Sequence, residues 1–360
     1  MRIERKCLIA LLILLVVSIH GFAAGNQEML ADLMVEDLIM TVRGPIPAAD
    51  FGMVLSHEHI VGSFTKKDKI APYDRDAVVD TMIPLLRAVK KRGFISIVET
   101  TPVDLSRDVI ALQTLAKATN MHIVTNTGNY GGFGDGLLLP YGFTEDADQL
   151  AARWIKEFDE GIEGTEIKPG FIKIAIDQGS LSEIDQKLAR AAARAHLQTG
   201  LVINCHTAEA VAAVELVETI RSEGVDPSAL IVTHSDEIPD RNIHFKLAEA
   251  GAWVSFDHIG RPNQTIENHV ELIKSMLERG YGHRVLIAHD SVWYDVADPD
   301  GWLIMGDVRL HPALGGAPWA TTIPDQLVPA LENAGVSSKD IQMLLVDNPA
   351  KALTIRVREL

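Results

Sequence analysis

Residues 53–59 read Met-Val-Leu-Ser-His-Glu-His, a short apolar run that ends in polar residues. Short apolar runs bounded by polar residues are typical of buried strands. Side chains at positions i and i+2 of a strand point to the same face, so His57 and His59 would face the same object. We therefore expect a buried strand here whose end carries two convergent imidazoles.

Similar apolar runs recur along the chain, and amphipathic stretches at helical spacing separate them. After Met53–Ser56, the expected strands are Phe94–Val98, Met121–Thr125, Phe171–Ile176, Leu201–Asn204, Ala229–Thr233, Ala252–Phe256 and Arg284–Ala288. The expected helices include Val78–Lys91, Asp108–Ala118, Asp146–Glu160, Glu183–Gln198, Ala210–Arg221 and Ile266–Arg279. Eight strands, most of them followed by a helix, predict an α/β fold of the (β/α)8 or TIM-barrel type, formed as a single domain by residues 24–360.

The main alternative to the barrel is a doubly wound open sheet. That fold would carry a phosphate-binding turn, G-x-G-x-x-G or G-x-x-x-x-G-K-[ST], after an early strand. Neither motif occurs there, and Gly131, Gly132, Gly134 and Gly136 have a different spacing and lead into no predicted helix. We interpret this glycine-rich stretch as a flexible loop and favour the barrel.

The charge of the chain excludes some classes of protein. Its 360 residues include 33 Lys and Arg and 49 Asp and Glu, which gives a net charge of 33 − 49 = −16. Such an acidic surface repels phosphate backbones and anionic lipids, so binding to nucleic acid or to membranes is not expected. With only Cys7 and Cys205, a disulfide scaffold is excluded as well.

The first 23 residues have the pattern of a secretory signal peptide. Met1–Lys6 is basic, Cys7–Ile19 is almost wholly apolar, and Gly21 and Ala23 are small residues of the kind that precede a cleavage site. We predict cleavage after Ala23 and an exported protein, periplasmic or secreted, whose mature form has no membrane span. An uncleaved anchor is the alternative, but the apolar run is shorter than the roughly 20 residues that cross a bilayer.

Polar side chains close several of the other predicted strands. His206 follows the fifth run, His234 the sixth, and His289-Asp290 the eighth. Because the carboxyl ends of barrel strands form one face, these side chains should meet the two histidines of the first strand. A single histidine in such a place is more often a structural hydrogen-bonding residue. Several imidazoles with a carboxylate at one level instead favour a site for zinc, manganese, cobalt or iron.

Lys173 is an unusual residue for the interior of the fourth apolar run. A lysine within a strand usually reaches the surface with its ammonium group. Burial beside cations would instead lower the pKa of this amine, because it disfavours the charged form. A neutral amine can react with carbon dioxide, and the resulting carbamate is a carboxylate-like group able to bridge two metal ions.

The six residues His57, His59, Lys173, His206, His234 and Asp290 resemble the ligand set of the phosphotriesterase family of the amidohydrolase superfamily. Further matching segments are Gly44-Pro45, Leu55–His59, Arg107-Asp108, Thr127-Gly128, Gly224–Pro227, His234–Asp236, Asp257-His258 and Asn348–Ala350. The resemblance covers about residues 39–353, and its motifs are specific for the family.

The resemblance implies a binuclear centre of two divalent ions, most often zinc. His57, His59 and Asp290 would hold the buried ion and His206 and His234 the exposed one, with carbamylated Lys173 and a hydroxide bridging both. Asp290 would also act as the base, and His258 would carry its proton outward. The next relay position falls on Glu237, where the family usually has an aspartate. A homodimer is also implied.

The sequence leaves the substrate open. Tyr130 occupies a position where lactonase-like members of this family carry a tyrosine, which favours a lactone or carboxylic ester, with phosphotriester cleavage as a side activity. His258 instead resembles the organophosphate branch, so a phosphotriesterase remains the alternative enzyme. The alternatives of other classes are a barrel that binds metal or ligand without catalysis, and an interaction protein.

Overall fold

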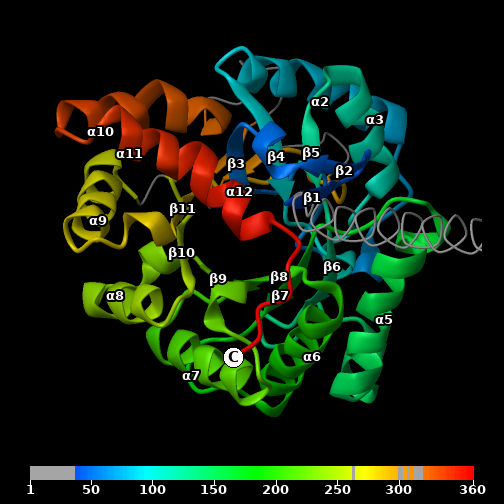
Figure 1. The fold of residues 1–360 in the computed structure, drawn as a ribbon. Helices are drawn as coiled ribbons and strands as arrows, with labels where there is room; N and C mark the ends of the chain where they lie inside the picture. Colours follow the sequence, from blue (N-terminus) through cyan, green and yellow to red (C-terminus); the bar gives the residue numbers. More distant parts are fainter. Residues whose placement is uncertain (1–36, 262–263, 299–302, 306–307, 311–318) are drawn as a thin grey trace, which may run out of the picture. The chain divides into compact units, whose positions relative to one another are not determined.

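Parallel strands surrounded by helices make up residues 38–360, which form a unit separate from residues 1–37 (Figure 1). The structure is a computed structural model that describes residues 37–261, 264–298, 303–305, 308–310 and 319–360, so the predicted signal peptide lies outside it. The inner strands are β3 (Met53–Glu58), β4 (Phe94–Glu99), β5 (His122–Val124), β6 (Asn126–Tyr130), β7 (Phe171–Ala175), β8 (Val202–His206), β9 (Leu230–Thr233), β10 (Trp253–Phe256) and β11 (Val285–Ile287).

The inner strands follow chain order in space. One parallel sheet runs β3-β4-β5 and the other β6-β7-β8-β9-β10-β11, and only Thr125 separates β5 from β6. Hydrogen bonds also join the last strand to the first: the Ser56 hydroxyl donates to the Ile287 carbonyl (2.9 Å), and the Asp290 amide donates to the His57 carbonyl (3.1 Å). This arrangement of parallel strands is consistent with the expected (β/α)8 barrel.

The third predicted strand is longer than expected. It was predicted to end at Thr125, but the chain continues as β6 to Tyr130, paired in parallel with β7. Polar residues in this segment hid the strand, because their side chains are satisfied inside the barrel. Gly128 is required there: its φ is 119°, and a Cβ would overlap the carbonyl oxygen of Lys173.

The surrounding helices cover the outer face of the strands (Figure 1). The long ones are α2 (Arg75–Lys90), α3 (Val109–Thr119), α5 (Ala147–Glu160), α6 (Glu183–Thr199), α7 (Ala210–Ser222), α8 (Arg241–Glu249) and α9 (Ile266–Glu278), and shorter ones are α4 (Pro140–Thr144), α10 (Val328–Asn333), α11 (Ser338–Gln342) and α12 (Asn348–Leu353). Asp146 and Ser182 begin α5 and α6 with capping boxes, and Gly200 ends α6 in the left-handed conformation. Within the described residues, no helix is long and apolar enough to cross a membrane.

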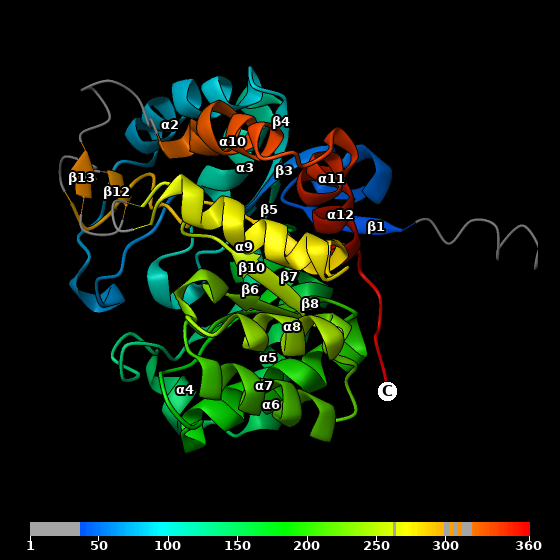
Figure 2. The ribbon, with the colours of Figure 1, turned by 90° about the vertical axis from the view of Figure 1, so that its left-hand side faces the viewer.

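The two ends of the strand ring carry different elements (Figure 2). One end has α4 and the hairpin of β12 (Leu303–Met305) and β13 (Val308–Leu310); the other has β1 (Leu38–Thr41), paired antiparallel with β2 (Gly44–Pro47), and the C-terminus. The C-terminal tail is fixed by backbone bonds: Arg356 donates to Gly200 and Leu360 to Gly224, each at 3.0 Å. The carboxyl ends of the strands are therefore free to form a site at the opposite end.

Candidate metal centre

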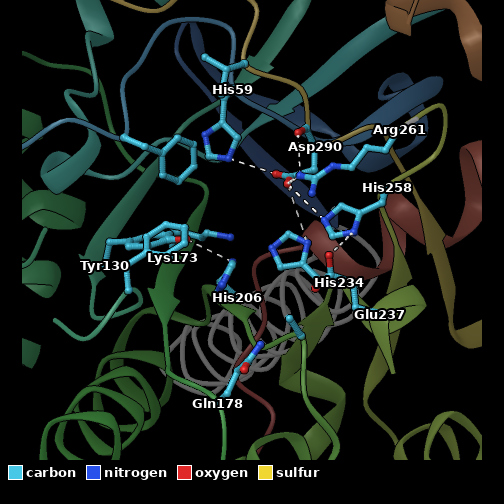
Figure 3. A pocket seen from close by; sticks show the side chains of 14 residues that line it. His59, Tyr130, Lys173, Gln178, His206, His234, Glu237, His258, Arg261 and Asp290 are labelled. Atoms are coloured by element: carbon cyan, nitrogen blue, oxygen red, sulfur yellow. Dashed lines mark hydrogen bonds and ion pairs between the residues drawn. The ribbon is translucent and has the colours of Figure 1, made fainter. Parts of the chain in front are cut away.

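The polar side chains predicted to converge do so in one cavity of about 300 Å³ (Figure 3). His206 closes β8, and His234, His258 and Asp290 follow β9, β10 and β11, whereas Lys173 lies in the middle of β7. The predicted residues that line the cavity are His59, Tyr130, Lys173, His206, His234, Glu237, His258 and Asp290. His57 lies beneath it, almost fully buried, with its Nε2 3.3 Å from the Asp290 carboxylate.

Three of these side chains form a group that can hold a metal ion. Asp290 Oδ1 lies 3.3 Å from His57 Nε2 and 3.2 Å from His59 Nε2, and the donor atoms all lie within 4.8 Å of one another. Asp290 has the left-handed φ of 50° and donates its amide to the His57 carbonyl across the β11–β3 seam. The backbone of the seam therefore fixes this group.

The remaining predicted ligands lie beside this group. Lys173 Nζ is 3.4 Å from His57 Nε2 and donates to Asn204 Oδ1 at 3.2 Å. The rings of His206 and His234 are 4.4 Å apart between centroids, and His57 and His234 are 5.4 Å apart. Two nitrogen ligands and an amine thus occupy the wall next to the first group.

A different second cluster of donor atoms, within 4.8 Å of one another, consists of His234, Asp257 and His258. Asp257 is fully buried and does not line the cavity, and its Oδ1 accepts hydrogen bonds from His234 Nδ1 (2.8 Å) and the His234 amide (2.9 Å). Because it already binds the Nδ1 side of the ring, Asp257 orients His234 rather than sharing a cation with it. His206 and His234 therefore remain the candidate ligands of a second metal ion.

Three of the four histidines have a hydrogen-bond partner at Nδ1, and for His234 it is Asp257. His59 Nδ1 lies 2.9 Å from the Thr101 hydroxyl, and His206 Nδ1 lies 3.2 Å from the Tyr130 hydroxyl. The exception is His57, whose Nδ1 lies 3.6 Å from the second oxygen of Asp257, beyond hydrogen-bond distance. Partners at Nδ1 leave the Nε2 lone pair for a cation, which is the usual arrangement around metal-bound histidine. The donor set therefore fits a metal centre.

Burial keeps three of the predicted nitrogen ligands, His57, His206 and His234, uncharged near neutral pH. It lowers the pKa of His57 to about 3, with Lys173 adding to the effect, and it lowers the pKa values of His206 and His234 well below the usual range. Burial also lowers the pKa of Lys173 to about 8. Neutral imidazoles and a partly neutral amine are ready to accept cations near neutral pH.

A chain of hydrogen-bonding groups leads from Asp290 outward, as expected. Asp290 Oδ2 is 3.5 Å from His258 Nε2, and His258 Nδ1 is 3.0 Å from Glu237 Oε1. Burial opposes the charged ring, but the Asp290 and Glu237 carboxylates outweigh it and raise the pKa of His258 to about 10. Asp236 is instead held by His269 (2.9 Å) and the His258 amide (2.8 Å), so it fixes the backbone of His258.

The outer part of the cavity comes from loops, and sequence analysis missed it. Phe64 and Phe133 pack on Tyr130 with ring centroids 5.9 and 5.8 Å away, which makes an aromatic wall. Gln178 and Arg261 also line the cavity. No strand periodicity marks these residues, because loop segments supply them. The glycine-rich stretch predicted as a flexible loop carries Phe133 and forms hydrogen-bonded turns, Asp135 to Gly131 and Leu138 to Asp135.

Comparison with known proteins identifies the family of this chain. The family model of the phosphotriesterase family matches residues 37–353. The chain belongs to the phosphotriesterase family. Curated proteins similar to it include an aryldialkylphosphatase of Saccharolobus solfataricus, 26% identical over 85% of this chain and 96% of the relative, and an N-acetyltaurine hydrolase of Xenopus tropicalis, 24% identical over 88% and 98%.

A solved structure also resembles this chain in both fold and sequence. A variant of a phosphotriesterase-like lactonase from Deinococcus radiodurans superposes with a TM-score of 0.77 and 27% identity, over 88% of this chain and 99% of that one. The fold and the family of the chain thus agree with what its ligand motif implied. Members of this family are hydrolases, and the donor set described above is the part of the structure suited to that chemistry.

Proposed function

We propose that this chain is a hydrolase dependent on two divalent metal ions, acting on lactones or related carboxylic esters. One observation carries the proposal: three imidazoles with partnered Nδ1 atoms, a buried lysine and Asp290 line one cavity, and the imidazole of His57 lies directly beneath it. His57, His59 and Asp290 would hold one ion and His206 and His234 the other. Zinc suits this set best, and manganese, cobalt or iron would also fit.

Lys173 would join the two ions as a carbamate. Its nearly complete burial and its pKa of about 8 leave part of the amine neutral near pH 7. The amine nitrogen attacks the carbon of CO₂, an N–C bond forms, and one proton is released, so the product carries one negative charge. That group replaces a repelled ammonium with an oxygen ligand.

Bound divalent ions would supply an activated water near neutral pH and polarise the oxygen of the substrate's C=O or P=O group. The side chains of this chain would handle the proton. Asp290 Oδ2 would accept it. Cations bound beside Asp290 would offset the carboxylate that raises the pKa of His258, so that the ring is neutral with its proton on Nδ1. His258 would then receive the proton at Nε2 while releasing the one on Nδ1 to Glu237 Oε1. Glu237 is the most exposed of the three, with 36% of its side chain accessible, so it returns the proton to solvent.

Several features bear on the substrate. Tyr130 favours a lactone, and the structural neighbour named a lactonase supports the same choice. A phosphotriesterase as the main activity is the second candidate, supported by His258 and by the relative named an aryldialkylphosphatase. The relative named an N-acetyltaurine hydrolase adds amides to the substrates worth testing.

We also propose export after cleavage of residues 1–23 and a homodimer as the working state. Both rest on the sequence and the family resemblance. An exported protein should appear in a cell's periplasmic or secreted fraction with a new N-terminus at Ala24. Retention of residues 1–23 in that fraction would contradict the cleavage.

The experiment that tests the activity is a substrate panel on metal-reconstituted protein, with and without chelator. Lactones, aryl esters, paraoxon-like phosphotriesters and N-acetyltaurine are compared by kcat/KM, and Lys173→Ala serves as the metal-site control. We expect lactones to lead by at least about tenfold and chelation or Lys173→Ala to abolish turnover. A lead by phosphotriesters would select the second candidate, and turnover by a metal-free Lys173→Ala protein would refute the mechanism.

A further inference from the structure

Arg261 lines the cavity with a cationic side chain that is not part of the proposed proton path (Figure 3). It lies three residues after His258 on the segment that follows β10. Its Nη2 contacts the Asp290 carboxylate and lies 3.4 Å from the Asp290 carbonyl oxygen. The side chain is 19% exposed, and its buried Nε has no hydrogen-bond partner among the described residues.

The carboxylates that line the cavity are already engaged. Asp290 lies 3.2 Å and 3.3 Å from His59 and His57, in the group that would hold a cation. Glu237 is 3.0 Å from His258 Nδ1. Among the described lining residues these are the carboxylates present. Asp290 offers Oδ1 to the histidine group, and Arg261 shares its Oδ2 with His258. Once a cation binds at Asp290, Arg261 therefore has only a shared carboxylate oxygen in this wall.

A largely buried guanidinium whose Nε is unpartnered and whose counter-charge is shared with a cation is costly, and an oxyanion of the ligand can supply further charge. Guanidinium groups bind carboxylates and sulfonates through paired N–H donors, which gives geometry as well as affinity. The opposite wall is aromatic, formed by Phe64, Tyr130 and Phe133. The cavity thus offers a cationic side next to the metal group and an apolar side across from it.

We propose that the substrate carries a second, non-reacting oxyanion and that Arg261 binds it. The inference rests on the proposed hydrolase and narrows its substrate class to anionic esters, lactones or amides. Arg261 already touches Asp290, so the anion lies only a few bonds from the reacting carbonyl. Asp290 and Arg261 line the same cavity of about 300 Å³, so one small substrate can reach both.

A matched substrate pair tests this inference. The probes are 5-oxotetrahydrofuran-2-carboxylate, a lactone with a carboxylate, and the corresponding carboxamide, which has nearly the same shape without the charge. kcat/KM is measured for both with metal-loaded native protein, Arg261→Gln and Arg261→Lys. Arg241→Gln is the control, because it removes the same guanidinium group at a more exposed position, where Arg241 pairs with Glu271 at 3.0 Å and does not line the cavity.

We expect the native protein to prefer the carboxylate by at least about tenfold in kcat/KM. Charge-assisted hydrogen bonds of this kind correspond to about 10–100-fold, so Arg261→Gln should reduce the preference by at least tenfold. Arg261→Lys should retain part of it, and Arg241→Gln should leave it unchanged. Equal turnover of the two probes by native protein would overturn the inference, as would an unchanged preference in Arg261→Gln.

Binding of a non-reacting analogue separates this inference from the proposed activity. Tetrahydrofuran-2-carboxylate lacks the carbonyl and is titrated calorimetrically into the same metal-loaded proteins. Binding by native protein that Arg261→Gln weakens at least tenfold supports the anion site even if neither lactone is hydrolysed. Turnover of the neutral lactone together with no Arg261-dependent binding would preserve the hydrolase and refute the anion site.

Discussion

Replacing Thr101 with Val should weaken metal binding without touching a ligand. The Thr101 hydroxyl lies 2.9 Å from His59 Nδ1 and donates to Glu99 Oε1 at 2.5 Å, so it links the imidazole to a buried carboxyl. Loss of such an outer partner costs about 10–100-fold in metal affinity, or about 1.4–2.7 kcal/mol. The metal-free protein should also lose about 1–3 kcal/mol for each buried group left unsatisfied.

Thr125→Val is the matched control, because the Thr125 hydroxyl is buried with no hydrogen-bond partner in the described structure. Metal content is measured at a series of buffered free zinc concentrations, and stability is measured by denaturant unfolding of chelated protein. We expect Thr101→Val to lose affinity and stability and Thr125→Val to keep both. A Thr101→Val protein that binds zinc within twofold of native would refute the orienting role, as would an equal loss in Thr125→Val.

Three further predictions concern carboxyl groups. Burial raises the pKa of Glu99 from 4.5 to about 8, so between these pH values the folded protein holds a proton that the unfolded chain releases. The free energy of unfolding of the chelated native protein should therefore fall, relative to that of Glu99→Gln, as pH rises from about 4.5 to 8. The same pH dependence in both proteins would contradict this. Asp290→Asn should retain most of its metal but lose at least about 100-fold in kcat, and unchanged turnover would remove it as base. The Asp104 carboxylate accepts hydrogen bonds from the backbone amides of Tyr130 (2.7 Å) and Leu139 (2.9 Å), one at each end of the loop 131–138. Asp104→Asn should therefore speed amide hydrogen exchange in this loop and raise KM. Unchanged exchange rates would refute the role of Asp104 in holding the loop.

The predicted ligands were accessible from sequence because strand geometry places them. An apolar run shows where a strand ends, and alternation shows which side chains converge, so His57 and His59 could be paired without a structure. The same reasoning brought Lys173 and His206 to one end of the barrel. These inferences depend on short stretches of chain with regular backbone, which local residue patterns describe well.

Other features depend on contacts between distant segments. β6 is polar in sequence but buried, because Asn126 donates to the carbonyls of Glu99 and Thr101 at 3.0 Å. Hydrophobicity alone therefore ends the strand too early. Arg261 and Phe133 reach the cavity through loops whose paths are set by tertiary hydrogen bonds, such as Gly134 to Asp177 at 2.9 Å. A single sequence contains no periodic signal for such paths.

The seam between β11 and β3 ties the site to the order in which the chain is synthesised. The His59 amide donates to the Ser291 carbonyl at 2.9 Å, and the Asp290 amide donates to the His57 carbonyl. The end of β3, which is synthesised early, is therefore hydrogen-bonded to the segment after β11, which is synthesised late. A ribosome must deliver nearly the whole chain before these groups can meet. A nascent or truncated chain that stops before residue 290 would lack a closed seam, and stable zinc uptake would then mark the completion of folding.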